Sequence, residues 1–158
     1  MADAARQVEK AKSDSGRGPG FKKLYNLHIS VARDGDRARQ WAKRNTSYGL
    51  AGAYLRYPEV LSAIGLWPDE VAPVAEAYAK GLGIEEAARR VSDDLLRRAG
   101  FVVAGTPAEC IPPCLEIKRQ LIELGFDHLV FGVPLGPDVG EALELLGKEV
   151  IPAVLAAG

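Results

Sequence analysis

Strand-forming segments are scarce in this sequence, and their scarcity limits what the chain can fold into. The clearest strand is Leu24–Ala32, in which apolar residues alternate with polar ones at a period of two. A second strand is predicted at Asp127–Phe131, and the short apolar run Phe101–Gly105 is a third candidate. Because predicted helices separate these segments, we expect parallel pairing through helical crossovers. A sheet of two or three parallel strands has two bare edges, which is too little for a complete catalytic domain.

Helix starts are marked by capping residues. Asp34 or Asp36 can cap a long helix that ends at Pro58, and Thr106 with Glu109 forms a capping pair. Further helices are predicted at 2–13, 67–80, 84–98, 107–124 and from 138 to the end of the chain. The sequence therefore predicts a helix-rich α/β fold.

Charge and hydropathy exclude several classes of function. No segment approaches the roughly 20 apolar residues that cross a bilayer, and the charged stretch Met1–Lys12 does not resemble a signal peptide. A net charge of −1 over 158 residues gives no electrostatic reason to bind nucleic acid or an anionic membrane. We expect a cytoplasmic protein without nucleic-acid or membrane partners. Cys110 and Cys114 are interpreted as buried thiols, and no metal site is expected.

Three segments carry a resemblance to a known family. They are Phe101–Cys110 (FVVAGTPAEC), Gly125–Gly132 (GFDHLVFG) and Val133–Asp138 (VPLGPD), the last leading to Glu149–Pro152. In this order, and after the strand Leu24–Ala32, they resemble the C-terminal part of luciferase-like oxidoreductases. The nearest resemblance is to methylenetetrahydromethanopterin reductases and related enzymes that use the deazaflavin coenzyme F-420.

The resemblance implies a fold and a domain organisation. Members of the family are (β/α)₈ barrels of the TIM type, which typically need about 250 residues. Residues 1–158 would form a single partial barrel domain, the C-terminal portion of such a barrel, with 33–100 as a helical insertion between the last two strands. The family's N-terminal strands have no counterpart in this sequence.

The candidate site follows from the barrel, because function in barrels lies at the C-terminal ends of the strands. His28 and Ser30 lie at the end of the first strand, and Gly132, Pro134, Leu135 and Gly136 form the predicted loop after the last one. These six residues are the expected cofactor contacts. The alternative for His28 is a side chain satisfied by Asn26, and the alternative for the loop is a rigid turn that closes the barrel.

The function implied by the resemblance is hydride transfer between coenzyme F-420 and a small-molecule substrate. Such chemistry needs no protein nucleophile, and no catalytic residue is assigned. Without the N-terminal half of a barrel, activity is expected to require a homo-oligomer or a complementing chain. Two alternatives stay open: an FMN-dependent luciferase-like monooxygenase, and a truncated, non-catalytic fragment that acts only in folding or dimerisation.

Overall fold

The computed structural model describes residues 2–16, 21–99 and 102–157. Along the chain the elements are α1 (Ala2–Asp14), β1 (Leu24–Val31), α2 (Gly35–Arg56), α3 (Pro58–Ala63), α4 (Pro68–Ala79), α5 (Gly83–Arg89), α6 (Asp93–Arg98), β2 (Val102–Gly105), α7 (Pro107–Glu123), β3 (His128–Leu135), α8 (Val139–Leu145) and α9 (Ile151–Ala156). A π-helical stretch, Leu146–Val150, joins α8 to α9. The expected helix-rich α/β fold is confirmed.

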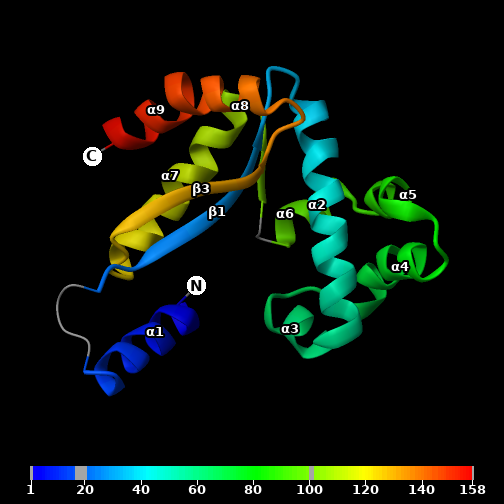
Figure 1. Ribbon diagram of the computed structural model, residues 1–158, viewed down its shortest axis with the longest axis horizontal. Helices are drawn as coiled ribbons and strands as arrows, with labels where there is room; N and C mark the ends of the chain where they lie inside the picture. Colours follow the sequence, from blue (N-terminus) through cyan, green and yellow to red (C-terminus); the bar gives the residue numbers. More distant parts are fainter. Residues whose placement is uncertain (1, 17–20, 100–101, 158) are drawn as a thin grey trace.

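The three strands form one parallel sheet in the order β2-β1-β3. His28 of β1 is in register with Val102 on one side and with Gly132 on the other. Figure 1 shows β1 beside β3 along most of its length, whereas the short β2 meets only the end of β1 near α2. A consecutively wound barrel would place β2 between its sequence neighbours. In this chain β1 is central instead, and β2 and β3 are the edges among the described strands.

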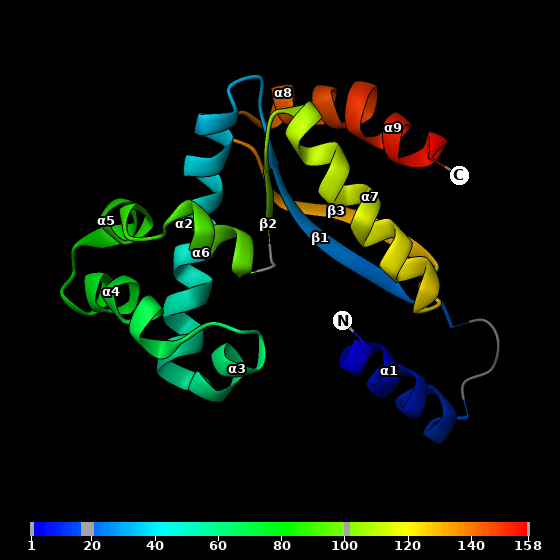
Figure 2. The ribbon, with the colours of Figure 1, turned by 180° about the vertical axis from the view of Figure 1, so that it is seen from behind.

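Helices pack on both faces of the sheet, because successive side chains of a strand point to opposite faces. One face, which includes Leu27, Ile29 and Val31, is buried with the side chains of α7, α8 and α9. The other face presents Val102 and Ala104 to a second core built from α2, α4, α5 and α6. Figure 2 shows α7 and α9 together on one side of the sheet and the group α2 to α6 beside β2.

Side-chain caps fix where the helices begin. The Asp34 carboxylate accepts from the backbone amides of Asp36 and Arg37, and Asp138 accepts from that of Glu141. Thr106 and Glu109 form the predicted capping box at the start of α7. In these three helices the cap lies directly after a strand, so each helix starts at the same edge of the sheet.

Several predicted boundaries were wrong. The segment 84–98 is two helices, because the Ser92 hydroxyl accepts from the amide of Leu95 and starts α6. The long helix after Asp34 ends at Arg56, and Pro58 begins the separate helix α3. Helix α7 continues through Pro112 and Pro113, whose missing N–H groups leave two backbone hydrogen bonds unmade.

The predicted helical insertion corresponds to a continuous group of helices in the structure. The range 33–100 contains α2 to α6, and it lies between β1 and β2 because the uncertain apolar run is a strand from Val102 onward. Phe101 itself lies outside the described residues. Among the helices that the structure describes, none combines the length and the apolar character needed to span a bilayer.

Candidate functional site

Ser30 lies inside the protein, between β1 and α2. Its side chain is fully buried, and its hydroxyl donates a 2.8 Å hydrogen bond to the carbonyl oxygen of Ala38 in α2. This bond joins the C-terminal half of β1 to the first turns of α2. The structure therefore gives Ser30 a role in holding helix and strand together.

His28 is on the same face of β1 as Ser30 and is half-buried. It lines a cavity of about 250 Å³ between β1, α2 and α3, together with Asn45 and Thr46. Asn26, the alternative partner for His28, packs its side chain against Gly132 instead. A Cβ added to Gly132 would collide with the Asn26 amide. Within the described part of the chain, no hydrogen bond or ion pair involves the His28 imidazole.

Gly132, Pro134 and Leu135 are not in a loop, because β3 continues to Leu135. The pairing of β3 with β1 is irregular between His28 and Ser30, and the Val133–Pro134 peptide bond is cis. Proline is tolerated in a strand at an edge or a bulge, and β3 has both features. The predicted loop was placed too early because glycine and proline usually indicate a turn.

Gly136 lies where two backbone segments pack too closely for a side chain to fit between them. It is buried, and a Cβ at this position would be 2.5 Å from the carbonyl oxygen of Val31. Its amide donates to the Pro134 carbonyl over 2.7 Å. The structure thus brings Gly136 and Ser30 together at the end of β1, while His28 lines a cavity farther down the strand.

An open groove lies beside this edge of the sheet, next to Pro137. Its cavity volume is about 630 Å³, and Arg37, Trp41 and Arg44 of α2 line it opposite Arg89 of α5. The guanidinium of Arg44 stacks on the Trp41 ring at 4.5 Å and pairs with Glu85 at 2.9 Å. Arg37 has no ion-pair partner among the described residues.

No ligand contact was predicted from the sequence for the arginines that line this groove. The sequence does contain a pattern that could have indicated the groove. Arg37, Trp41 and Arg44 are three or four residues apart and therefore share one face of α2. The neighbouring Arg39 faces the sheet edge instead. Its hydrogen bonds to Asp36 and Glu109 raise the guanidinium pKa above its ordinary value.

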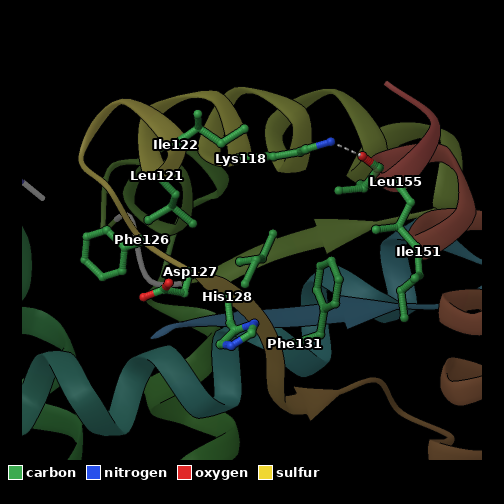
Figure 3. Close-up of a pocket in the computed structure, with 11 residues that line it drawn as sticks. Lys118, Leu121, Ile122, Phe126, Asp127, His128, Phe131, Ile151 and Leu155 are labelled. Carbon is green, nitrogen blue, oxygen red and sulfur yellow. Dashed lines mark hydrogen bonds between the residues drawn. The ribbon is translucent and has the colours of Figure 1, made fainter. Parts of the chain in front are cut away.

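A third cavity, of about 360 Å³, lies at the opposite end of the sheet. Figure 3 shows Phe126 and His128 at one side of it, and Lys118 of α7 and Ile151 of α9 at the other. Its lining is mostly apolar, and the Lys118 ammonium donates to the carbonyl oxygen of Val154 over 2.8 Å. This cavity is remote from the C-terminal ends of the strands.

The cysteines match their interpretation as buried thiols. Cys110 and Cys114 are free and fully buried in α7, and burial raises their pKa values to about 12 and about 11. A thiol of this kind is a poor nucleophile at neutral pH. No group of three His, Cys, Asp or Glu side chains in the described ranges is placed to hold a metal ion.

Sequence comparison finds 5,10-methylenetetrahydromethanopterin reductases among the relatives of this chain. The chain is 34% identical over 136 residues to a 5,10-methylenetetrahydromethanopterin reductase of Archaeoglobus fulgidus, a match that covers 84% of this chain and 38% of the relative. It is 32% identical over 125 residues to the reductase of the same name from Methanopyrus kandleri, covering 78% of this chain and 33% of the relative. Most of this chain is homologous to part of a 5,10-methylenetetrahydromethanopterin reductase. The predicted resemblance is confirmed, although no family model matches the sequence.

The fold comparison agrees with the reductase relationship. The solved structure of the coenzyme F-420 dependent tetrahydromethanopterin reductase from Methanopyrus kandleri matches with a TM-score of 0.75 and 27% identity. The match covers 96% of this chain and 41% of that chain. The chain therefore spans between 33% and 41% of the length of these reductases.

Proposed function

We propose that this chain supplies part of an oxidoreductase that transfers hydride between coenzyme F-420 and a small-molecule substrate. The observation that supports the proposal most strongly is the 34% identity to a 5,10-methylenetetrahydromethanopterin reductase over 136 residues. The agreement in fold with an F-420 dependent reductase adds to it. The matched part is a minority of each relative, so we propose that activity depends on strands from a complementing chain or another copy.

The groove beside the sheet edge fits an anionic coenzyme. Coenzyme F-420 carries a phosphate and carboxylates on the tail of its deazaflavin, and arginine recognises both groups through paired N–H donors. Asp36 and Glu85 also line the groove, but they are paired with Arg39 and Arg44. Arg37 is then the cation most available to an anionic tail. When bound, the deazaflavin supplies the hydride chemistry.

The remaining candidate contacts lie on β1, on β3 and directly after β3. We propose that Gly132, Pro134, Leu135 and Gly136 bring backbone groups next to the coenzyme ring and that His28 faces it from β1. Ser30 would contribute by fixing β1 against α2 through its bond to Ala38. The chain's part in the reaction would be to bind and orient the coenzyme, with no proton transfer assigned to its side chains.

A fluorescence titration of the purified chain with coenzyme F-420, run in parallel with FMN, tests this proposal. Saturable micromolar binding of F-420 alone is the expected result. Binding of FMN alone would replace the proposal with a flavin monooxygenase role. If neither binds, the non-catalytic alternative is favoured, and sedimentation of the same sample would show whether the chain self-associates.

A further inference from the structure

The outer edge of β3 is exposed along its whole length. β3 pairs with β1 on one side, and the backbone N–H and C=O groups on its other side have no strand partner among the described residues. None of its eight residues is buried, whereas half of those in β1 are. Parallel sheets are almost always covered by other elements in native proteins, so a further partner is expected at this edge.

The edge lacks the features that usually protect such a strand. Natural edge strands carry charged residues, prolines or bulges that prevent pairing with another chain. In β3 the irregularity and Pro134 come only after Gly132. The segment His128–Gly132 (HLVFG) is in regular register with Leu24–His28 and contains no Asp, Glu, Lys or Arg. These five residues are therefore open to pairing with a new strand.

Apolar side chains are exposed on both faces of the sheet around this segment. Val130 is 42% exposed and alternates with residues that face α7 and α9, so it lies on the opposite face. On the helix-covered face, Ile122 and Leu155 are 60% and 71% exposed. Both line the apolar cavity beside Leu129 and Phe131 (Figure 3). Exposed apolar groups gathered at an open edge indicate contact with another protein surface.

The free backbone groups and the absence of charge indicate the kind of partner. An open edge is recognised by another extended strand through main-chain hydrogen bonds. A strand that pairs with its own copy must also avoid like charges, because identical chains carry the same charge at each position. The segment His128–Gly132 is itself an extended, uncharged strand with one free edge. A second copy of this chain therefore fits the edge.

We infer that two copies of this chain dimerise by antiparallel pairing of their β3 strands along His128–Gly132. A two-fold axis perpendicular to the sheet makes the two strands antiparallel, and pairing of all five residues places the axis at the middle one, Val130. Val130 then faces its counterpart in the second copy, and each Leu129 faces a Phe131. The inference goes beyond the proposed function, because it would hold whether or not the chain binds a coenzyme.

Sedimentation velocity of the purified chain, over a range of concentrations and without coenzyme, is the first measurement. A reversible dimer at micromolar concentrations is expected. Val130→Lys should weaken dimerisation by more than about tenfold, because it brings two like charges together at the axis. Val60→Lys on α3 is the matched control, since Val60 is 44% exposed, and it should leave the dimer unchanged. Circular dichroism checks that each variant is folded.

Two further variants test the position of the axis. Val130→Glu alone should also weaken the dimer, whereas an equimolar mixture with Val130→Lys should restore it, because opposite charges then face each other. Val130→Cys should form a disulfide-linked dimer on mild oxidation, and Val60→Cys should not. Opposite Cα atoms in an antiparallel pair are about 4.5–5.5 Å apart, which a disulfide can bridge. The native Cys110 and Cys114 are buried and should not compete.

Three outcomes would overturn the inference. A chain that stays monomeric at every concentration would leave the edge to a complementing chain. A dimer that Val130→Lys does not weaken, or that Val60→Lys weakens equally, would place the interface elsewhere. A mixture of the two charged variants that stays monomeric, with no disulfide from Val130→Cys, would show that the two copies do not meet at Val130. None of these measurements uses coenzyme, so failure here is distinguishable from failure of the F-420 titration.

Discussion

Arg39 on α2 donates a hydrogen bond to Glu109 on α7 across 3.0 Å. The same carboxylate accepts from the amide of Thr106 over 2.7 Å and so caps α7. Neighbouring glycines make room for it: a Cβ on Gly35 would be 2.5 Å from a Glu109 oxygen, and one on Gly105 would be 2.7 Å away. A single carboxylate thus joins the starts of α2 and α7 to the end of β2.

Acid should weaken this junction. The Thr106 amide and hydroxyl, and then Arg39, hold the pKa of Glu109 below its ordinary value. A carboxyl with a lowered pKa in the folded state stabilises the protein above its unfolded pKa, and this contribution is lost as pH falls through the folded pKa. Glu109→Gln should therefore lower the urea midpoint at pH 7, and the difference from the parent should shrink below about pH 4. A difference that is constant from pH 7 to pH 3 would contradict this prediction.

Ser30→Ala should reduce stability without changing coenzyme affinity. It removes a buried hydrogen bond to Ala38, which typically contributes about 1 kcal/mol. Urea unfolding measures the loss, and the F-420 titration measures the affinity. Ser15→Ala is the control, since that serine is exposed in the turn after α1 and its bond to Lys12 is local. Weaker coenzyme binding at unchanged stability would instead give Ser30 a direct contact with the ligand.

Gly136→Ala should destabilise the fold. The new Cβ would lie 2.5 Å from the Val31 carbonyl and 3.1 Å from the Cβ of Ala142, so β1 or α8 would have to move. We expect a loss of about 1–3 kcal/mol, the usual cost of overpacking, measured by urea unfolding. Gly147→Ala is a matched control, because no atom lies within 4 Å of the added Cβ there. Equal stability of the two variants would show that the Gly136 backbone has room to adjust.

Arg37→Gln should weaken binding of coenzyme F-420 by about tenfold through the loss of one charge-assisted contact. The salt dependence of the affinity should also become smaller, because one exposed charge pair is removed. Arg97→Gln, an exposed arginine paired with Asp94 on α6, is the control and should leave affinity unchanged. Equal effects of the two variants would point to net charge rather than to the groove.

The parts of the fold that the sequence predicted rest on local chemistry. The alternation around Leu27 identifies β1, and Thr106 with Glu109 marks the start of α7, because both signals act within a few residues. The side of β1 on which β2 and β3 pair depends on contacts between distant segments, which local patterns do not encode. Gly132 and Pro134 led to the wrong prediction of a loop, because an irregular edge strand and a turn use the same residues.

The candidate site was less predictable than the fold. His28 could be singled out as a polar residue on an alternating strand, but its neighbour in space, Thr46, looks like an ordinary residue of a long helix. Nothing in the sequence indicates that the Thr46 hydroxyl is buried with no hydrogen-bond partner among the described residues. The groove around Arg37 needs the register between α2 and α5, which is also a tertiary property.

The central place of β1 in the sheet sets an order of events during protein synthesis. A ribosome makes β1 before all of α2 to α7, and both strands that pair with it emerge only later. The helices between β1 and β2 share their own core and can collapse around α2 as soon as α6 has been made. Until β2 and β3 emerge, the nascent β1 lacks the backbone partners that they give it in the sheet. Slow translation of residues 102–135 would therefore lengthen the interval in which β1 lacks the two strands that pair with it in this sheet.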